Sequence, residues 1–178
     1  MTSPRPSAAT TPWLRRNPER LIDRPVARAL ILALFAVAMG HLEAVVVYYI
    51  RLDLGDVHGT GTIPPEVLRS FPWGIEATRE VATLVMLGTV AVLAGRTWSR
   101  RLAALLWTFA VWDATYYASL RVLTGWPPSL LSPDIYFLLP VPWGGPVWVP
   151  LAADVAIAAA AAMLVVRGPG SSGSPGAA

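Results

Sequence analysis

The chain has 178 residues, of which 54% are hydrophobic and 14% are charged. A soluble domain has about 25% charged residues, so this composition predicts a membrane protein. The absence of cysteine excludes disulfides, thiolate nucleophiles and thiolate metal ligands. The formal net charge of +3 comes from arginines that lie mainly outside the apolar runs, a pattern that excludes a nucleic-acid-binding surface.

Four apolar runs predict four transmembrane helices, because a helix of about 20 residues crosses the ~30 Å hydrocarbon layer. Their expected bounds are 26–50, 73–95, 102–123 and 147–166. We therefore expect an all-α polytopic membrane protein with a four-helix transmembrane domain over residues 26–167. A basic segment, disordered or interfacial, is expected over residues 1–25 and a flexible tail over 168–178.

The first run predicts a helix with one face of small residues. At helical spacing Ala36, Gly40 and Glu43 lie on one stripe, and small residues let a second helix approach closely. Glu43 should therefore point into the bundle. His41 lies about 200° around the helix from Glu43 at ~100° per residue, so we expect it to hydrogen-bond to a neighbouring helix. The polar connection 51–71 is expected to be a solvated loop.

The second run carries Glu76, Arg79 and Glu80 in its first half. A charged side chain near the middle of a membrane costs roughly 2.5 to 3.5 kcal/mol on insertion scales, so these groups need partners inside the bundle. Glu76, Glu80 and Thr83 share one face of the helix, and Arg79 lies one turn from Glu76. This run predicts the polar centre of the protein.

The third and fourth runs each carry an aspartate, Asp113 and Asp154. Tyr116 and Tyr117 follow Asp113 by one helical turn. The connection between these runs, 126–146, is rich in proline and aromatic residues. Its Ser132 and Pro133 resemble an N-cap and first helical residue, which predicts a short helix over 133–139, either interfacial or re-entrant.

The arginines predict the orientation in the membrane. They gather before the first run and between the second and third runs, so both termini should be cytoplasmic in a bacterial inner membrane. Five acids from the four helices then come within about 5 to 15 Å of the outer boundary, at ~1.5 Å per residue. These acids are Glu43, Glu76, Glu80, Asp113 and Asp154.

The acids and aromatic residues that lie at this depth predict a cavity in the outer half of the bilayer. We expect it to bind or act on a lipid-soluble or small cationic ligand by acid/base chemistry, with Glu80 and Asp113 as the candidate catalytic pair. The remaining expected ligand-binding residues are Glu43, Glu76, Arg79, Tyr116, Tyr117, Asp134 and Asp154. If protons neutralise the excess acids, substitutions of Glu80 by Gln or Asp113 by Asn should preserve or raise thermal stability.

The sequence is also compatible with other functions. It does not establish whether the protein is an enzyme or whether it binds a cofactor. Carboxylates on four helices could hold a metal, although the Glu-x-x-His repeat typical of such bundle sites is absent. The acids could instead pair with arginines to fix helix register in a non-catalytic subunit. A transport component would have to form a homo-oligomer, because four short helices without an inverted repeat enclose no pathway. Membrane lipids are the expected partners in every case.

Three runs carry a resemblance to a known family: HLEAVVVYYIR, EATREVATLVML and VWDATYYASLRVLTGWPPSLLSPDIYFLLPVPWGGPV. They resemble a family of uncharacterised small bacterial integral membrane proteins with four helices. The resemblance covers roughly residues 30–150. It implies the four-helix architecture and the motif positions Glu43, Glu76, Arg79, Glu80, Asp113 and Asp134, and it implies no activity.

Overall fold

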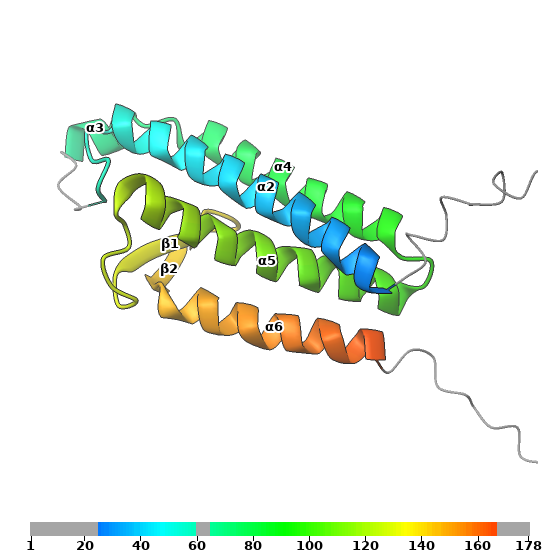
Figure 1. Ribbon diagram of the computed structural model, residues 1–178. Helices are drawn as coiled ribbons and strands as arrows, with labels where there is room; N and C mark the ends of the chain where they lie inside the picture. The colour runs from blue at the N-terminus through cyan, green and yellow to red at the C-terminus, as the bar shows by residue number, and fades with distance from the viewer. Residues whose placement is uncertain (1–24, 60–64, 167–178) are drawn as a thin grey trace, which may run out of the picture.

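The computed structural model describes residues 25–59 and 65–166, so the expectations for residues 1–24 and for the tail 168–178 lie outside it. Four long helices run side by side as a bundle, and a short helix and a two-stranded hairpin lie at one end (Figure 1). The helices are α2 (Pro25–Asp53), α3 (Pro65–Ser70), α4 (Trp73–Ala94), α5 (Trp98–Thr124) and α6 (Trp148–Val166). The strands are β1 (Pro133–Phe137) and β2 (Trp143–Pro146).

The structure is mostly helical, as predicted, and each apolar run forms most of one long helix. The bounds of α5 follow from its caps. Thr97 is its N-cap and accepts the backbone N–H of Arg100 at 3.4 Å, so α5 begins before the apolar run does. Gly125 ends it with a φ of +77° and donates its N–H to the carbonyl of Arg121 at 3.1 Å.

Helix α5 is the central element, because it packs against α2, α4 and α6. Buried side chains form three clusters along its length. The cluster farthest from the hairpin contains Leu32, Ala91 and Ala104. The middle cluster contains Ala36, Met39, Leu87 and Trp112. The cluster nearest the hairpin contains Ala44, Tyr117, Leu120, Trp126 and Val147.

The predicted small-residue face of α2 is its contact with α5. Ala36 and Gly40 are both buried there. A Cβ on Gly40 would lie 2.4 Å from the carbonyl oxygen of Trp112, so only glycine allows the two backbones to approach this closely. On another face of the same helix, Nδ1 of His41 lies 3.2 Å from Oγ of Ser119 on α5, which confirms the expected bond to a neighbouring helix.

The prediction of a short helix over 133–139 is wrong. Residues Pro133–Phe137 form strand β1, which pairs antiparallel with Trp143–Pro146, and the register shifts between Ile135 and Phe137. Ser132 forms a turn instead of an N-cap, because its N–H donates to the carbonyl of Ser129 at 3.0 Å. The β-branched and aromatic run Ile-Tyr-Phe favours a strand, and the glycines opposite it allow close pairing. A Cβ on Gly144 would lie 2.0 Å from the carbonyl oxygen of Asp134.

The connection expected to be a loop over 51–71 also contains helical structure. Helix α2 continues to Asp53, and α3 occupies Pro65–Ser70. Pro65 at the start of α3 suits a first helical position, because its missing N–H has no intrahelical acceptor there. Residues 54–59 join α2 to the undescribed residues 60–64 through turns.

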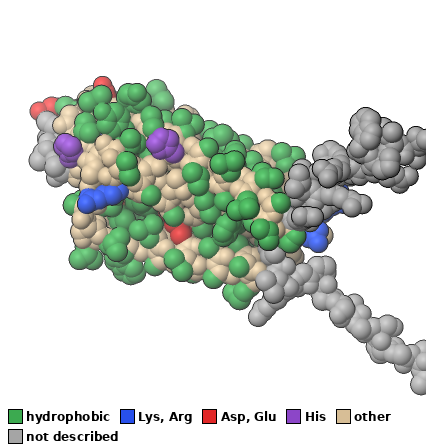
Figure 2. Space-filling view, in the orientation of Figure 1, with side chains coloured by type: hydrophobic (Ala, Val, Ile, Leu, Met, Phe, Trp, Pro, Cys, Tyr) green, Lys and Arg blue, Asp and Glu red, His purple; other side chains and the backbone are tan. Residues whose placement is uncertain are grey.

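Two of the described helices, α2 and α4, are long and apolar enough to cross a membrane. The apolar part of α6, Trp148–Leu164, is shorter. Hydrophobic side chains are spread along the bundle in Figure 2, and on that face most of the charged side chains lie toward its two ends. The described termini, Pro25 and Val166, lie at the same end of the bundle (Figure 1).

Candidate ligand cavity

A cavity of about 1100 Å³ lies in the hairpin end of the bundle, bounded by α2, α4, α5, the hairpin and α6. Every site residue predicted from the sequence lines it. Its acidic residues are Glu43, Asp56, Glu76, Glu80, Asp113, Asp134 and Asp154, and its arginines are Arg51 and Arg79. Its aromatic residues are Phe71, Trp73, Phe109, Trp112, Tyr116, Tyr117, Trp126, Tyr136, Phe137 and Trp143. The wall is therefore mostly apolar, with acids in excess over bases.

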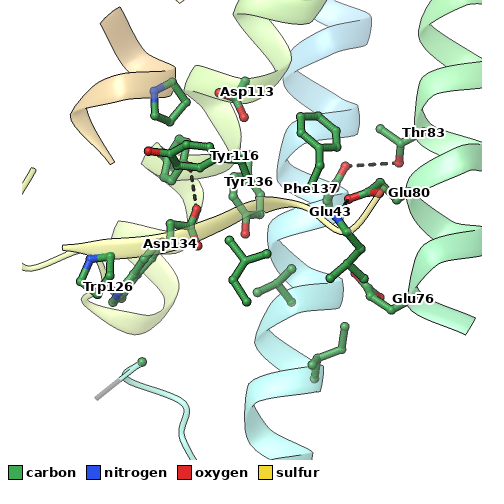
Figure 3. Close-up of a pocket in the computed structure, with 18 of the residues that line it drawn as sticks. Glu43, Glu76, Glu80, Thr83, Asp113, Tyr116, Trp126, Asp134, Tyr136 and Phe137 are labelled. Atoms are coloured by element: carbon green, nitrogen blue, oxygen red, sulfur yellow. Dashed lines mark hydrogen bonds between the residues drawn. The ribbon is translucent and has the colours of Figure 1, made fainter. Parts of the chain in front are cut away.

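Glu43, Glu76 and Arg79 form an ion-pair cluster between α2 and α4. The guanidinium of Arg79 donates to the carboxylates of both glutamates, including a bond from Nε to Glu76 Oε1 of 2.8 Å. Oε2 of Glu43 also accepts the indole N–H of Trp112 at 2.9 Å and the hydroxyl of Thr83 at 3.4 Å (Figure 3). One arginine and two neutral donors therefore satisfy two carboxylates, so this cluster has an internal structural role.

Glu80 holds the hairpin against α4. Its two carboxylate oxygens accept the backbone N–H groups of Leu138 and Leu139 at 2.9 and 3.1 Å. Glu80 is 6% exposed, so these charge-assisted bonds replace the water that its carboxylate would otherwise bind. A carboxylate with both oxygens occupied in this way positions the hairpin, and its lone pairs are less available to a ligand.

Asp134 of β1 faces α5 at the base of the hairpin (Figure 3). Its Oδ2 accepts the hydroxyl of Tyr117 at 2.6 Å. Burial raises the pKa of Asp134, and the bonds from Tyr117 and from the backbone of Ile135 and the charge of Arg51 oppose that rise. This bond also ties the hairpin to α5, on the side away from Glu80.

Asp113 and Asp154 face each other across the contact between α5 and α6. The carboxyl of Asp113 is the interacting partner of Asp154. Asp154 is 5% exposed, and outside this pair its carboxyl oxygens have no hydrogen-bond partner among the described residues. The sequence placed Asp113 with Glu80, whereas the structure places it with Asp154. Helical spacing within one segment carries no information on which helices become neighbours, so only the tertiary structure identifies this pair.

Arg51, in the last turn of α2, also lines the cavity. Its guanidinium carbon is 4.3 Å from the ring centroid of Trp126, a cation–π contact. The Nη1 atom of Arg51 is buried and has no hydrogen-bond partner. Arg121, near the end of α5, does not line the cavity and donates to the carbonyls of Gly125 and Pro127. Helical periodicity could not predict that Trp126 lies beside Arg51, because Trp126 follows the turn that ends α5.

Within the described ranges 25–59 and 65–166, no group of three or more His, Asp or Glu side chains is arranged to hold a metal ion. The cluster of Glu43 and Glu76 is occupied by Arg79, and the two oxygens of Glu80 by backbone N–H groups. The carboxylates that the sequence analysis considered as metal ligands therefore bind different protein groups and do not converge on one point.

A scan against protein-family models finds no match for this chain, and searches of curated proteins and of solved structures find none either.

Proposed function

We propose that this protein is a four-span membrane protein whose cavity binds a lipid-soluble ligand and transfers a proton to or from it. Asp113 and Asp154 are the proton-transfer pair. The observation that carries the proposal is the position of the buried Asp154 and the partly buried Asp113 on the wall of a mostly apolar cavity of about 1100 Å³. A cavity of this size accommodates a ligand the size of a lipid chain or a small terpenoid.

The pairing of two acids supports the acid/base part of the proposal. Two interacting buried carboxyls do not both ionise easily, so one retains a proton while the other is a carboxylate. The pair then offers a donor and an acceptor at one place, which is what proton relocation on a substrate requires. Asp113 is the only hydrogen-bond partner of the Asp154 carboxyl among the described residues, so a proton held between them has no third group to neutralise it.

The surface of the bundle supports the membrane part. Large apolar side chains project outward from each long helix, for example Leu34 on α2 at 71% exposed, Leu93 on α4 at 81% and Val155 on α6 at 72%. Such residues are stable in contact with lipid and costly in contact with water. Helix α5 carries the arginines and Asp113 that make it less apolar, and it is the helix that the other three surround.

Deuterium incorporation tests the proposed activity. The purified protein is incubated with a membrane lipid extract in D₂O, and the lipids are analysed by mass spectrometry. If a C–H bond breaks with its proton passing to the carboxylate, and a deuteron returns from the exchanged carboxyl, a lipid gains one deuterium without any redox change. We expect this mass shift with the native protein and its loss in Asp154→Asn. Glu66→Gln, the same acid-to-amide change at an exposed position on α3, is the matched control.

The same preparation gives a second readout. Native mass spectrometry should find a lipid-soluble molecule bound to the protein. A protein that carries no bound molecule and exchanges no lipid proton would contradict the proposal and leave the acids with a structural role only.

A further inference from the structure

The hairpin of β1 and β2 lies between α4 and α6. In the described part of the chain, both helices pack against α5, and neither packs extensively against the other. The cavity is lined by residues of both helices, for example Thr83 of α4 and Ala153 of α6, and by β1 between them. Figure 3 shows β1 crossing from Asp134, beside α5, toward Glu80 on α4. The hairpin therefore covers the gap that these two helices leave beside the cavity.

The hairpin is attached to α6 by the chain itself. Strand β2 ends at Pro146 and α6 begins two residues later. Between them, the N–H of Val147 donates to the carbonyl of Ser132, just before β1, at 3.0 Å. The bond from Tyr117 of α5 to Asp134 holds the same end of β1. This end of the hairpin is therefore fixed to α5 and α6, and any movement of the hairpin must turn about it.

The opposite end of the hairpin is held to α4 by Glu80. Its carboxylate accepts the backbone N–H groups of Leu138 and Leu139, which begin the loop between the two strands. Release of these two bonds breaks no pairing between β1 and β2, so the hairpin can swing as a unit. Release also leaves a carboxylate and two N–H groups without partners, which is costly, so the closed hairpin is the resting state.

The outward side of the hairpin is apolar. Asp134 is the only charged residue in the segment 126–146, and it faces α5. At and beside the loop, Leu139, Val141 and Trp143 are 37%, 65% and 52% exposed. These side chains suit contact with lipid and are costly in contact with water. The free strand edges need water or lipid headgroups, and the position of the hairpin at the end of the bundle provides them (Figure 1).

We infer that the hairpin is a gate through which a lipid-soluble ligand enters the cavity sideways from the outer leaflet, between α4 and α6. Glu80 is the latch of this gate. When Glu80 releases Leu138 and Leu139, the loop moves away from α4 into the surrounding lipid, which its apolar side chains already contact. The inference rests on the proposed function and adds the source of the ligand, which comes from the membrane and not from water.

Nitroxide labels on single cysteines test the position of the gate, since the chain has no cysteine of its own. The full-length protein is reconstituted in phosphatidylcholine vesicles. Collisions of the label with oxygen, which concentrates in the bilayer, are compared with collisions with nickel ethylenediaminediacetate, a neutral chelate that stays in water. Oxygen collisions should dominate at Val141→Cys in the hairpin loop, and nickel collisions at Asp53→Cys, exposed at the end of α2. Dominant nickel collisions at Val141→Cys would overturn the inference.

A label at Ala153→Cys, on the cavity wall, tests the opening itself. Addition of Glu80→Gln should raise its oxygen collisions at least twofold and leave its nickel collisions low. Glu66→Gln, the same change at an exposed position on α3, is the matched control and should alter neither. A rise in nickel collisions instead would overturn the inference, because the entrance would then face water. No change with either reagent would overturn it too, because the hairpin would then not open.

Two further measurements separate opening from unfolding. A label at Leu93→Cys, near the far end of α4, should give the same collisions with and without Glu80→Gln if the bundle stays intact. Glu80→Asp, which keeps the charge on a shorter side chain, should give a smaller rise in oxygen collisions at Ala153→Cys than Glu80→Gln gives. Equal rises for the two variants would contradict the role of Glu80 as a latch.

These collision measurements involve no proton transfer, so they can fail independently of the proposed function. Deuterium incorporation into lipid together with unchanged collisions in Glu80→Gln would overturn the gate and retain the proposed activity. An opening hairpin in a protein that neither binds a molecule nor exchanges a lipid proton would support the gate and contradict the activity.

Discussion

The indole N–H of Trp112 donates to the carboxylate of Glu43 at 2.9 Å, directly beside the place where α5 comes closest to α2. The backbone carbonyl of the same tryptophan is the atom that a Cβ on Gly40 would strike, at 2.4 Å. Close packing and the partly buried ion-pair cluster of Glu43 therefore depend on each other, because a wider separation of the helices would lengthen this bond.

Gly40→Ala should destabilise the protein by about 1 to 3 kcal/mol, the usual cost of overpacking, and lower its melting temperature. Gly88→Ala is the matched control, since a Cβ on Gly88 meets nothing within 4 Å. That substitution should stabilise the protein by about 1 kcal/mol, because alanine is the better helix former. Thermal unfolding followed by circular dichroism measures both variants. Equal melting temperatures for the two would show that α2 and α5 pack less closely than described.

Glu80→Gln should detach the hairpin from α4. Glutamine offers one carbonyl oxygen where the carboxylate offers two, so the N–H of Leu138 or Leu139 loses its acceptor, at a cost of about 1.5 to 3 kcal/mol. This expectation reverses the one from sequence, in which an uncharged Glu80 preserved stability. Hydrogen–deuterium exchange at Leu138 and Leu139 should accelerate, and the control Glu66→Gln should leave it unaltered. Unchanged exchange in Glu80→Gln would show that these bonds do not hold the hairpin.

Asp154→Asn should preserve or raise the melting temperature. Outside its pair with Asp113, Asp154 has no hydrogen bond to lose, and the amide N–H of asparagine can still donate to Asp113. The substitution also removes the repulsion between the two carboxylates when both are ionised. Differential scanning calorimetry in detergent measures the change. A large fall in melting temperature would mean that the carboxylate of Asp154 has a stabilising partner, such as a bound cation. In that case added chelator should destabilise the native protein but not the variant.

Asp134 should make stability decline as pH rises. Burial raises its pKa in the folded state, so folding favours the protonated form. Its contribution is full below the unfolded pKa of about 3.9 and is lost as pH rises through the folded value. Asp134→Asn keeps an oxygen acceptor for Tyr117 but does not titrate. As pH increases from about 4, the melting temperature of the native protein should therefore fall relative to that of the variant. A constant difference across this pH range would exclude a raised pKa.

Single cysteines test the orientation, since the chain has none of its own. Asp53→Cys lies at the end of α2 and Arg96→Cys in the turn between α4 and α5, and both positions are exposed. In intact cells a membrane-impermeant maleimide should label Asp53→Cys, whereas Arg96→Cys should react only after permeabilisation. Labelling of both from outside would rule out the four-span orientation with cytoplasmic termini.

The sequence predicted those parts of the fold that depend on one segment at a time. Periodicity located the long helices and the small-residue stripe through Gly40, because both are properties of a single helix. The hairpin was not predicted, because a Ser-Pro pair such as Ser132 and Pro133 is as common in a turn as at the start of a helix. Its strand character depends on the pairing of Asp134 with Gly145, eleven residues later in the chain and on the other side of a turn.

The site residues expected from the sequence line the cavity, but of their contacts helical spacing indicated the pairing of Arg79 with Glu76 and not the others. Burial of acids in a membrane-length helix identifies Glu43, Glu80 and Asp113 as residues that need partners. Which partner each one finds depends on how the helices rotate against one another. Thus Glu80 bonds to backbone N–H groups of the hairpin, and Asp113 meets Asp154.

The central position of α5 has a consequence for biogenesis. Helices α2 and α4 are apolar enough to enter a bilayer independently, whereas α5 carries Asp113 and charged ends and is not. In a membrane, the translocon must therefore release α5 together with a helix that covers its polar face, and α2 has the most extensive contact with it. A variant that weakens this contact should therefore insert less efficiently, in addition to being less stable once it has folded.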